Sequence, residues 1–394
     1  MIDFNNTQIA FAGKSNKGLK RAHWLFRTIA SPTIVAIGNF FAHTALKLHL
    51  PVAWIVKPTL YRQFVGGETI EDCIPAVREL EKFNVKAILD YSVEGGKAEA
   101  DFEAVLKETL RTIDHAAGDP NVPISVFKPT AFAPSHIFER ASAGQDLNEE
   151  ELAGVESFRK RVNILCEHAA KKDVPIMIDA EDVHYQAIID RVTLEMMEQY
   201  NQKKAIVFNT YQMYRTDRLE VLKKDFELAK KQGFFLGAKF VRGAYMERER
   251  RRAEKMGYPS PIHPDKPSTD RDYNAALTFS IANIDRISIF NGTHNEKSCH
   301  HLMELMQKAG LAKDDPRIWT SQLYGMSDHI SFNMADAGYN IVKYMPYGPV
   351  KSVLPYLLRR AEENTSIAGQ TGRELSLIKT ELKRRKQDRI EDRG

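Results

Sequence analysis

The sequence predicts an α/β fold: a (βα)8 barrel of the TIM type, with an N-terminal helical arm and a C-terminal helix over the barrel mouth. From about residue 85 onward, short apolar segments rich in β-branched and aromatic residues alternate with longer helical stretches. There are eight such segments across about 260 residues, which is the size of this barrel. Each is apolar along most of its length, as parallel strands are when helices cover the sheet.

The eight predicted strands follow one another in strict succession. We expect them at residues 86–92, 124–132, 175–181, 205–212, 234–243, 287–294, 317–325 and 340–348. Helical stretches such as 150–172, 216–231 and 296–309 separate them. A doubly wound sheet is the alternative fold, but the glycine-rich first turn typical of that fold is absent from the sequence.

The domain boundaries follow from where this alternation starts and stops. We expect a helical arm at 1–82, a barrel catalytic domain at 83–372, and an amphipathic helix with a charged tail at 373–394. The stretch 33–56 is apolar at helical spacing, but polar residues and Pro51 interrupt it, so we predict an amphipathic helix and no membrane span. Acidic residues dilute the basic run 383–386, which favours a solvated helix end.

Composition excludes several classes of protein. With 43% apolar and 27% charged residues the chain is globular, and a net charge of +4 is too small to predict a nucleic-acid partner. Cys73, Cys166 and Cys299 are odd in number and far apart, which excludes a disulfide framework and favours a reducing compartment. Because a secretory leader is not evident, we predict a cytoplasmic protein. The 33–56 helix and the C-terminal helix are candidates for peripheral contact with the inner face of the membrane, and packing on the barrel is the alternative for both.

The ends of the predicted strands are polar, and a barrel carries its active site at the carboxyl ends of its strands. The polar residues at these ends are Lys128, Asp179, Glu181, Gln212, Lys239, Arg242, His294, Asn295, Gln322 and Tyr344. They predict a wide pocket rich in hydrogen-bond donors, suited to a ligand with a phosphate or a polar heterocycle. Asp179, Glu181 and His184 have a spacing that suggests a metal site, but strand alternation separates His184 from the others, so we expect no metal.

Two adjacent arginines, Arg359 and Arg360, stand on the helix predicted after the last strand. Neighbouring positions are roughly 100° apart around a helix, so the two side chains need different partners. The neighbours Tyr356, Leu357 and Leu358 are too apolar for a solvated helix face. A guanidinium matches a carboxylate in two-point fashion, so we predict that the pair reaches over the barrel mouth and binds an anion.

Four segments together closely resemble the proline dehydrogenase family. They are 237–245 (GAKFVRGAY), 293–295 (THN), 344–348 (YMPYG) and 356–364 (YLLRRAEEN), and the resemblance covers most of the chain from about residue 61. It implies a monofunctional enzyme that binds FAD and oxidises L-proline to Δ1-pyrroline-5-carboxylate, the first step of proline catabolism. Hydride would pass from proline C5 to flavin N5, and the electrons would then pass to a membrane quinone. The chain is too short for a second catalytic domain, which implies hand-off to a separate pyrroline-5-carboxylate dehydrogenase.

The resemblance also implies site residues, position by position. For the substrate, it implies carboxylate binding by Arg359, Arg360 and Lys128, orientation of neighbours by Asp179, positioning of the arginines by Glu363, and ring contacts from Tyr344, Tyr356 and Phe240. For the flavin, it implies Gln212, Lys239, Val241, Gly243, Ala244, Tyr245, Lys266, Thr269, His294, Asn295 and Gln322. Strand alternation leaves open whether Lys239 or Arg242 faces the interior.

Three alternatives remain at the level of sequence. A 4-hydroxyproline dehydrogenase is disfavoured because the bulky Tyr344 would crowd a ring hydroxyl. A Schiff-base barrel would use Lys128 or Lys239 as its nucleophile, in a setting that depresses the lysine pKa. A non-enzymatic barrel that binds an amino acid or a nucleotide is the third.

Overall fold

The computed structural model describes residues 2–38, 53–93, 98–366 and 370–391. The chain divides into two compact units. The central unit is the continuous stretch Ala87–Ser321, and the terminal unit combines Met1–Lys86 with Gln322–Gly394.

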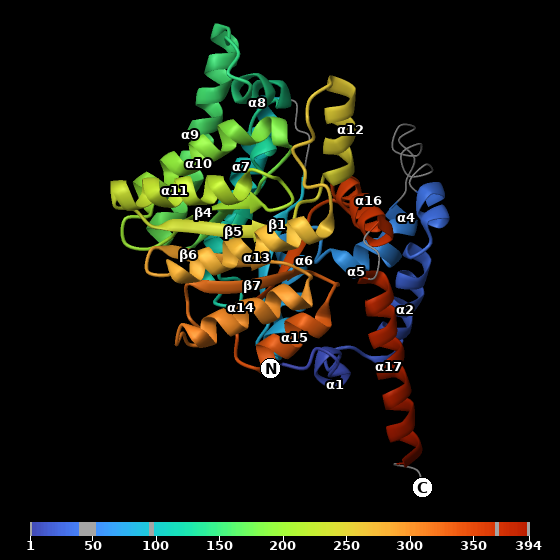
Figure 1. Cartoon of the computed structure of the whole chain (residues 1–394). Helices are drawn as coiled ribbons and strands as arrows, with labels where there is room; N and C mark the ends of the chain where they lie inside the picture. The colour runs from blue at the N-terminus through green and yellow to red at the C-terminus, as the bar shows by residue number, and fades with distance from the viewer. Residues whose placement is uncertain (1, 39–52, 94–97, 367–369, 392–394) are drawn as a thin grey trace. The chain divides into compact units, whose positions relative to one another are not determined.

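Eight strands form one sheet in the order β1-β8-β7-β6-β5-β4-β3-β2. Figure 1 labels β1, β4, β5, β6 and β7 of this sheet. Their bounds are β1 Lys86–Tyr91, β2 Ser125–Phe127, β3 Ile176–Ile178, β4 Val207–Gln212, β5 Leu236–Val241, β6 Ile287–Gly292, β7 Ile318–Leu323 and β8 Ile341–Tyr347. The pairings from β2 through β7 are parallel. From β2 to β8 the neighbours in the sheet are neighbours in sequence, and β1 adjoins β8, which is the order of a (βα)8 barrel. The predicted (βα)8 fold and all eight predicted strands are therefore confirmed.

The second and third strands are shorter than predicted, at three residues each. Pro129 opens a 3-10 turn directly after Lys128, and Pro175 directly precedes β3. Proline has no N–H to donate to a neighbouring strand, so each proline limits the regular ladder at that end. Lys128 and Asp179 follow the last paired residues of β2 and β3, which are Phe127 and Ile178.

Helices follow the strands of the central unit along the chain. They are α7 Glu99–Gly118, α8 Ser135–Ser142, α9 Glu149–Lys172, α10 Val183–Tyr200, α11 Arg218–Gln232, α12 Met246–Met256, α13 Lys266–Ala282 and α14 Glu296–Lys308. Side-chain caps mark the starts of several of these helices. In α9, for example, the Asn148 side chain accepts from Glu151 N and the Glu151 side chain accepts from Asn148 N, which satisfies two unpaired donors of the first turn.

Side chains of β4 and β5 alternate between the two faces of the sheet. Tyr211 and Phe240 lie on the helix-covered face, with ring centroids 5.9 Å apart, and the Tyr211 hydroxyl donates to Asp225 Oδ2 of α11 at 2.7 Å. Lys239 is therefore on the opposite face, because strand neighbours alternate. Arg242 returns to the helix side, where its Nε donates to Asp270 of α13. This answers the question that the sequence left open.

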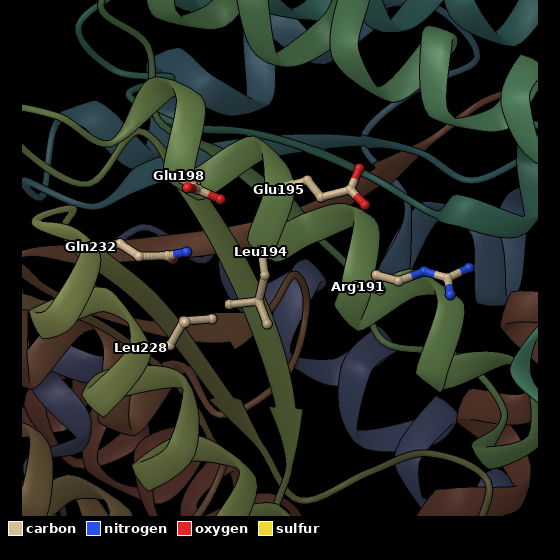
Figure 2. Close-up of a pocket in the computed structure, with 6 residues that line it drawn as sticks. All are labelled: Arg191, Leu194, Glu195, Glu198, Leu228 and Gln232. Carbon is tan, nitrogen blue, oxygen red and sulfur yellow. The ribbon is translucent and has the colours of Figure 1, made fainter.

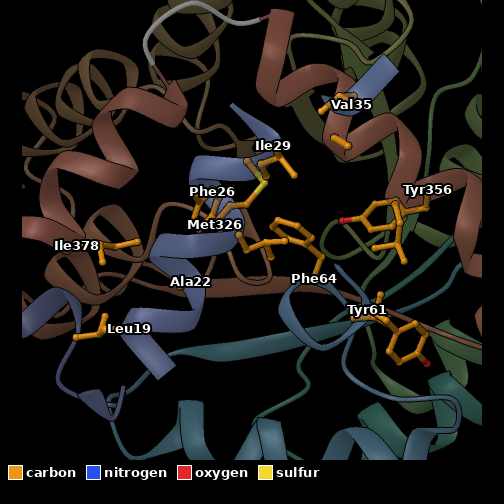
Figure 3. Packing of buried hydrophobic residues seen from close by; sticks show 14 of the residues in the cluster. Leu19, Ala22, Phe26, Ile29, Val35, Tyr61, Phe64, Met326, Tyr356 and Ile378 are labelled. Carbon is orange, nitrogen blue, oxygen red and sulfur yellow. The ribbon is translucent and has the colours of Figure 1, made fainter. Parts of the chain in front are cut away.

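In the terminal unit, segments from the two ends of the chain share one apolar core. Its helices are α1 Thr7–Ala10, α2 Asn16–Ile29, α4 Ala53–Val56, the π-helical Lys57–Tyr61, α5 Arg62–Phe64, α6 Ile70–Glu81, α15 Asp328–Asp336, α16 Val350–Ser366 and α17 Gln370–Glu391. Leu19 and Phe26 of α2 belong to the same cluster as Tyr356 of α16 and Ile378 of α17 (Figure 3). Leu357 of α16 belongs to it as well. The predicted stretch 33–56 lies partly outside the described residues, since 39–52 are not among them.

The basic run of the last helix is not simply solvated, in contrast to the sequence-based expectation. Arg385 donates to the backbone oxygens of Phe11 at 2.8 Å and Lys14 at 2.6 Å. Arg384 and Arg385 both bind Glu381, whose side chain is fully buried. These carbonyl groups come after the four-residue helix α1, where the backbone oxygens lack helical donors. The guanidinium of Arg385 supplies the missing N–H donors.

Asp328 ties the terminal unit together through two lysines. Its oxygens lie 2.8 Å from both Lys14 Nζ and Lys343 Nζ, and Lys343 is almost fully buried. Burial alone would raise the pKa of Asp328, but the two lysines outweigh it and hold that pKa far below its usual range. The first helical turn of α15 is thus bound to both the N-terminal segment and β8.

Asp225 makes the folding free energy depend on pH. Burial raises its pKa from 3.8 to about 6, and the Tyr211 hydrogen bond only partly offsets this. The protonated form is thus favoured on folding, so its stabilisation is complete below about pH 4 and is lost as pH rises through 6. Asp225→Asn cannot titrate, so the wild type should lose about 2–3 kcal/mol relative to this variant between pH 4 and 7.5, measured by urea unfolding. The exposed control Asp285→Asn should show no such change, and a pH-independent difference for Asp225→Asn would contradict the assignment.

Candidate active site

Four alternating charges link the carboxyl ends of four strands in the central unit. Asp90 lies in β1, Lys128 follows β2, Asp179 follows β3, and Lys239 lies in β5. Lys128 Nζ is 2.8 Å from Asp90 Oδ2 and 3.8 Å from Asp179 Oδ2, while Lys239 Nζ donates to Asp179 Oδ1 at 2.5 Å. Their side chains are at most 15% exposed, so each charge depends on its partners for stability. The structure thus brings three predicted site residues, Lys128, Asp179 and Lys239, together.

Gln212 ends β4 beside this chain of charges. The register partner of Gln212 on β5 is Val241, two residues beyond Lys239. Gln212 itself is 3% exposed. Its amide oxygen is buried and has no hydrogen-bond partner within the described residues. A buried acceptor of this kind is costly unless a ligand satisfies it, so the end of β4 fits a bound polar ring.

The chain turns sharply after β5, at Gly243. Its φ is +127°, and a Cβ there would lie 2.5 Å from the ring of Tyr214. Only glycine adopts this backbone conformation without strain and leaves room for that ring. Ala244 is exposed, and Tyr245 is half-buried at the start of α12, where the Arg248 guanidinium stacks on its ring at 4.3 Å.

A second charged group forms beside this turn, on the helix side of the sheet. Arg242 donates to Asp270 Oδ1 at 2.8 Å, Thr293 Oγ1 at 2.6 Å and Ser298 Oγ at 3.0 Å, and Lys266 pairs with Asp270 as well. Burial alone would raise the pKa of Asp270, but the cations Lys266 and Arg242 outweigh it and lower that pKa, so the carboxylate stays charged. The predicted residues Thr269, His294 and Asn295 are adjacent in sequence to this group or close to it, and Asn295 caps α14.

Phe240 is the predicted substrate contact that the structure does not bring to Lys239. It is fully buried on the opposite face, against Tyr211. The cause is strand parity, since consecutive residues of β5 point to opposite faces. Sequence reasoning also missed Asp90 and Asp270. A lone acid within the apolar segment 86–92 was the available signal for Asp90, whereas nothing in the sequence singles out Asp270.

The terminal unit holds the remaining predicted site residues. Tyr344 of β8 and Tyr356 of α16 are buried, and Arg360 is 9% exposed with its guanidinium carbon 5.4 Å from the Tyr356 ring. Arg359 is half-buried. The arginine pair is therefore largely removed from solvent, which confirms what the apolar neighbours predicted. Glu363 belongs to α16, but its side chain lies outside the described residues, and Gln322 Oε1 accepts from Ser331 Oγ at 2.7 Å.

A surface pocket of about 380 Å³ lies elsewhere, between α10 and α11 (Figure 2). Its lining residues are Arg191, Leu194, Glu195, Glu198, Leu228 and Gln232. Glu195 already pairs with Arg159 at 2.7 Å. The pocket contains none of the predicted site residues and lies on the outer helices, so we do not assign it to the reaction.

Parallel strands in (βα)8 order define the barrel class of α/β protein, and the ion-paired groups lie at the carboxyl ends of the strands, where the active sites of such barrels lie. The chain belongs to the proline dehydrogenase family, whose model matches residues 73–373, and it is an oxidoreductase. Within the described residues, we find no helix with the length and apolarity that a membrane crossing requires.

Several characterised proteins are similar to this chain. It is 35% identical to the carbapenem antibiotics biosynthesis protein CarD of Pectobacterium carotovorum, over 82% of this chain and 83% of the relative. It is 40% identical to human mitochondrial proline dehydrogenase 1 over 60% of this chain, but only 40% of the relative is covered. Hydroxyproline dehydrogenase of Xenopus laevis is 30% identical over 95% of this chain and 88% of the relative. The structure of proline utilization A from Bdellovibrio bacteriovorus has a TM-score of 0.73 at 21% identity, covering 94% of this chain and 40% of that protein, which supports the fold.

Gly243 provides a test of the turn after β5. Gly243→Ala should lower the free energy of unfolding by about 2–4 kcal/mol, because it adds both backbone strain and a clash with Tyr214. Gly257→Ala is the matched control, since Gly257 has a positive φ of +73° but open space around its Cβ, and it should cost about 1 kcal/mol. Chemical denaturation of both variants measures the difference, and equal losses would contradict the close approach of Tyr214.

Proposed function

We propose that this protein oxidises L-proline to Δ1-pyrroline-5-carboxylate with FAD and passes the electrons to a quinone, as the first step of proline catabolism. The observation that carries the proposal is the ion-paired Lys239 on the same barrel mouth as the unpartnered amide oxygen of Gln212. Family membership supports the oxidation of proline, and these two residues support a polar redox ring as the ligand.

The ends of β4 and β5 fit a flavin, which when bound would supply the acceptor for the hydride leaving proline C5. Lys239, held by Asp179, supplies a fixed positive charge where negative charge would develop on reduction. Gln212 supplies an amide for hydrogen bonding. Gly243 lets the chain turn after β5 close to the Tyr214 ring. The proposed FAD-binding set is Gln212, Lys239, Val241, Gly243, Ala244, Tyr245, Lys266, Thr269, His294, Asn295 and Gln322, to which we add Arg242 and Asp270 as residues that position Lys266 and Thr293.

The proposed substrate contacts are Arg359, Arg360 and Lys128 for the carboxylate, with Tyr344 and Tyr356 against the ring. Burial of Arg360 against the Tyr356 ring supports this role, because a stacked, partly desolvated guanidinium is pre-oriented for a planar carboxylate. Asp179 orients the lysines, and Glu363 is proposed to position the arginine pair. Phe240 supports the site indirectly, by packing under β5 against Tyr211.

Two alternatives are weaker. A Schiff-base lysine needs an apolar pocket or a neighbouring cation, whereas Lys128 pairs with Asp90 and Lys239 pairs with Asp179. A hydroxyproline substrate is favoured by one observation, the similarity to the Xenopus hydroxyproline dehydrogenase. The buried phenol of Tyr344 supports proline over its 4-hydroxy derivative, because it leaves less room for a ring hydroxyl.

Flavin bleaching tests the proposed reaction. The full-length protein, supplied with FAD, should be yellow, and its absorbance should bleach under anaerobic conditions when L-proline is added and return when a ubiquinone or menaquinone analogue is added. Trans-4-hydroxy-L-proline should bleach it about 10-fold or more slowly, the discrimination expected when one extra group is crowded. A colourless protein that forms a borohydride-trappable adduct with a carbonyl substrate would contradict the proposal and indicate a Schiff-base lysine.

Kinetics of arginine variants test the carboxylate site. Arg360→Ala should raise KM for L-proline about 100-fold or more while flavin content stays unchanged, because a charge-assisted hydrogen bond to the substrate is lost. Arg360→Lys keeps the positive charge but loses the two-point hydrogen bonding of the guanidinium, so it should raise KM by about 10-fold. This variant keeps the test decisive if the alanine variant does not fold. Arg317→Ala is the control, since Arg317 pairs with Asp315 outside the site. Loss of flavin with unchanged KM would refute the carboxylate assignment.

A further inference from the structure

Three metal-ligating side chains meet in the central unit, where the start of α10 approaches α12. Asp182 is the residue before α10, His184 lies in its first turn, and Glu249 lies in α12. One ligand atom from each lies within 4.8 Å of the other two. This cluster shares only His184 with the set Asp179, Glu181 and His184 that the sequence suggested. Asp179 instead binds Lys239, and Glu181 accepts from the Thr130 hydroxyl at 2.8 Å.

In each carboxylate of this cluster, one oxygen accepts a hydrogen bond from the protein and the other does not. Asp182 Oδ2 accepts from Arg248 at 2.5 Å, and Glu249 Oε1 accepts from Val183 N at 2.8 Å. Asp182 Oδ1, Glu249 Oε2 and His184 Nδ1 are buried and have no hydrogen-bond partner in the described part of the chain. Asp182 is 7% exposed and Glu249 is 1% exposed, so water in bulk does not satisfy them.

We propose that Asp182, His184 and Glu249 bind one divalent transition-metal ion, of which Zn²⁺ is the representative. One imidazole nitrogen and two carboxylate oxygens are ligands that Zn²⁺ accepts at about 2.0–2.2 Å. Two ligand atoms around one such ion lie roughly 3–4.4 Å apart, so the present spacing closes with small side-chain rotations. The occupied oxygens, bound to Arg248 and Val183 N, hold both carboxylates in place for the ion.

The two arginines beside the cluster are each paired with a carboxylate. Arg248 pairs with Asp182, and Arg252 pairs with Glu139. Glu249 has no ionic partner within the described residues, although it is almost fully buried. A proton shared by Asp182 and Glu249 would satisfy the two oxygens without involving His184, whereas one metal ion would bind both oxygens and an imidazole nitrogen.

The site would join two segments that border the reaction site without touching the proposed reactants. Asp182 lies three residues beyond Asp179, and α12 begins directly after Tyr245. Arg248 connects them further, since it bonds Asp182 and stacks on the Tyr245 ring. The ion would therefore hold the segment after β3 against the segment after β5, with water in its remaining position.

Metal binding by the full chain tests the inference. After treatment with a chelator and dialysis, the protein should bind one Zn²⁺ per chain in a titration with zinc chloride, and its melting temperature should rise by roughly 3–5 °C in excess zinc. His184→Gln and Glu249→Gln should each weaken zinc binding about 100-fold or more and abolish the rise. Glutamine at 249 keeps an amide oxygen for Val183 N, so that variant retains the cap of α10.

His168→Gln is the matched control, because His168 pairs with Asp114 at 2.8 Å away from the cluster. It should keep stoichiometric zinc binding and the thermal shift. The proposal is overturned if the wild type binds no stoichiometric zinc, or if His184→Gln and Glu249→Gln bind it as tightly as the control does. If the wild type binds no zinc and Glu249→Gln is more stable than the wild type at neutral pH, Asp182 and Glu249 share a proton instead.

Discussion

The carboxylate of Asp179 lies between two ammonium groups, and the polar end of the barrel depends on this pairing. Lys239 and Lys128 come from β5 and from the residue after β2, so one acidic side chain sets the relative positions of three strand ends. The Asp179 backbone N–H also donates to Phe127 O at 3.0 Å, which fixes the carboxylate against β2. A buried cation without a partner is costly, so these strand ends must meet for the fold to be stable.

One motif near β5 shows how each residue of a recognisable string has its own physical role. Lys239 points to the reaction face and Phe240 to the helices. Arg242 binds Asp270 on the helix side, and Gly243 makes the turn that passes close to Tyr214. The string therefore combines a charge, a core contact, an ion pair and a backbone conformation, and only some of these concern the substrate or the cofactor.

The eight strands and their polar ends could be predicted because apolar runs and the residues that close them are local features of the sequence. The side of the sheet that Phe240 occupies could not, since a shift of one residue in register reverses it. Partners such as Asp90 for Lys128, Asp270 for Arg242 and the carbonyls bound by Arg385 come from distant parts of the chain, so no local pattern indicates them. The cluster around Glu249 was missed for the same reason.

The shared core of the first and last helices has a consequence for how the chain is made. The central unit is continuous, so all of its residues leave the ribosome before the terminal unit is complete. Leu19 and Phe26 have to wait for Leu357 and Ile378, more than three hundred residues later, before they are covered. During synthesis the apolar face of α2 therefore stays uncovered by α16 and α17 until the last part of the chain has been made.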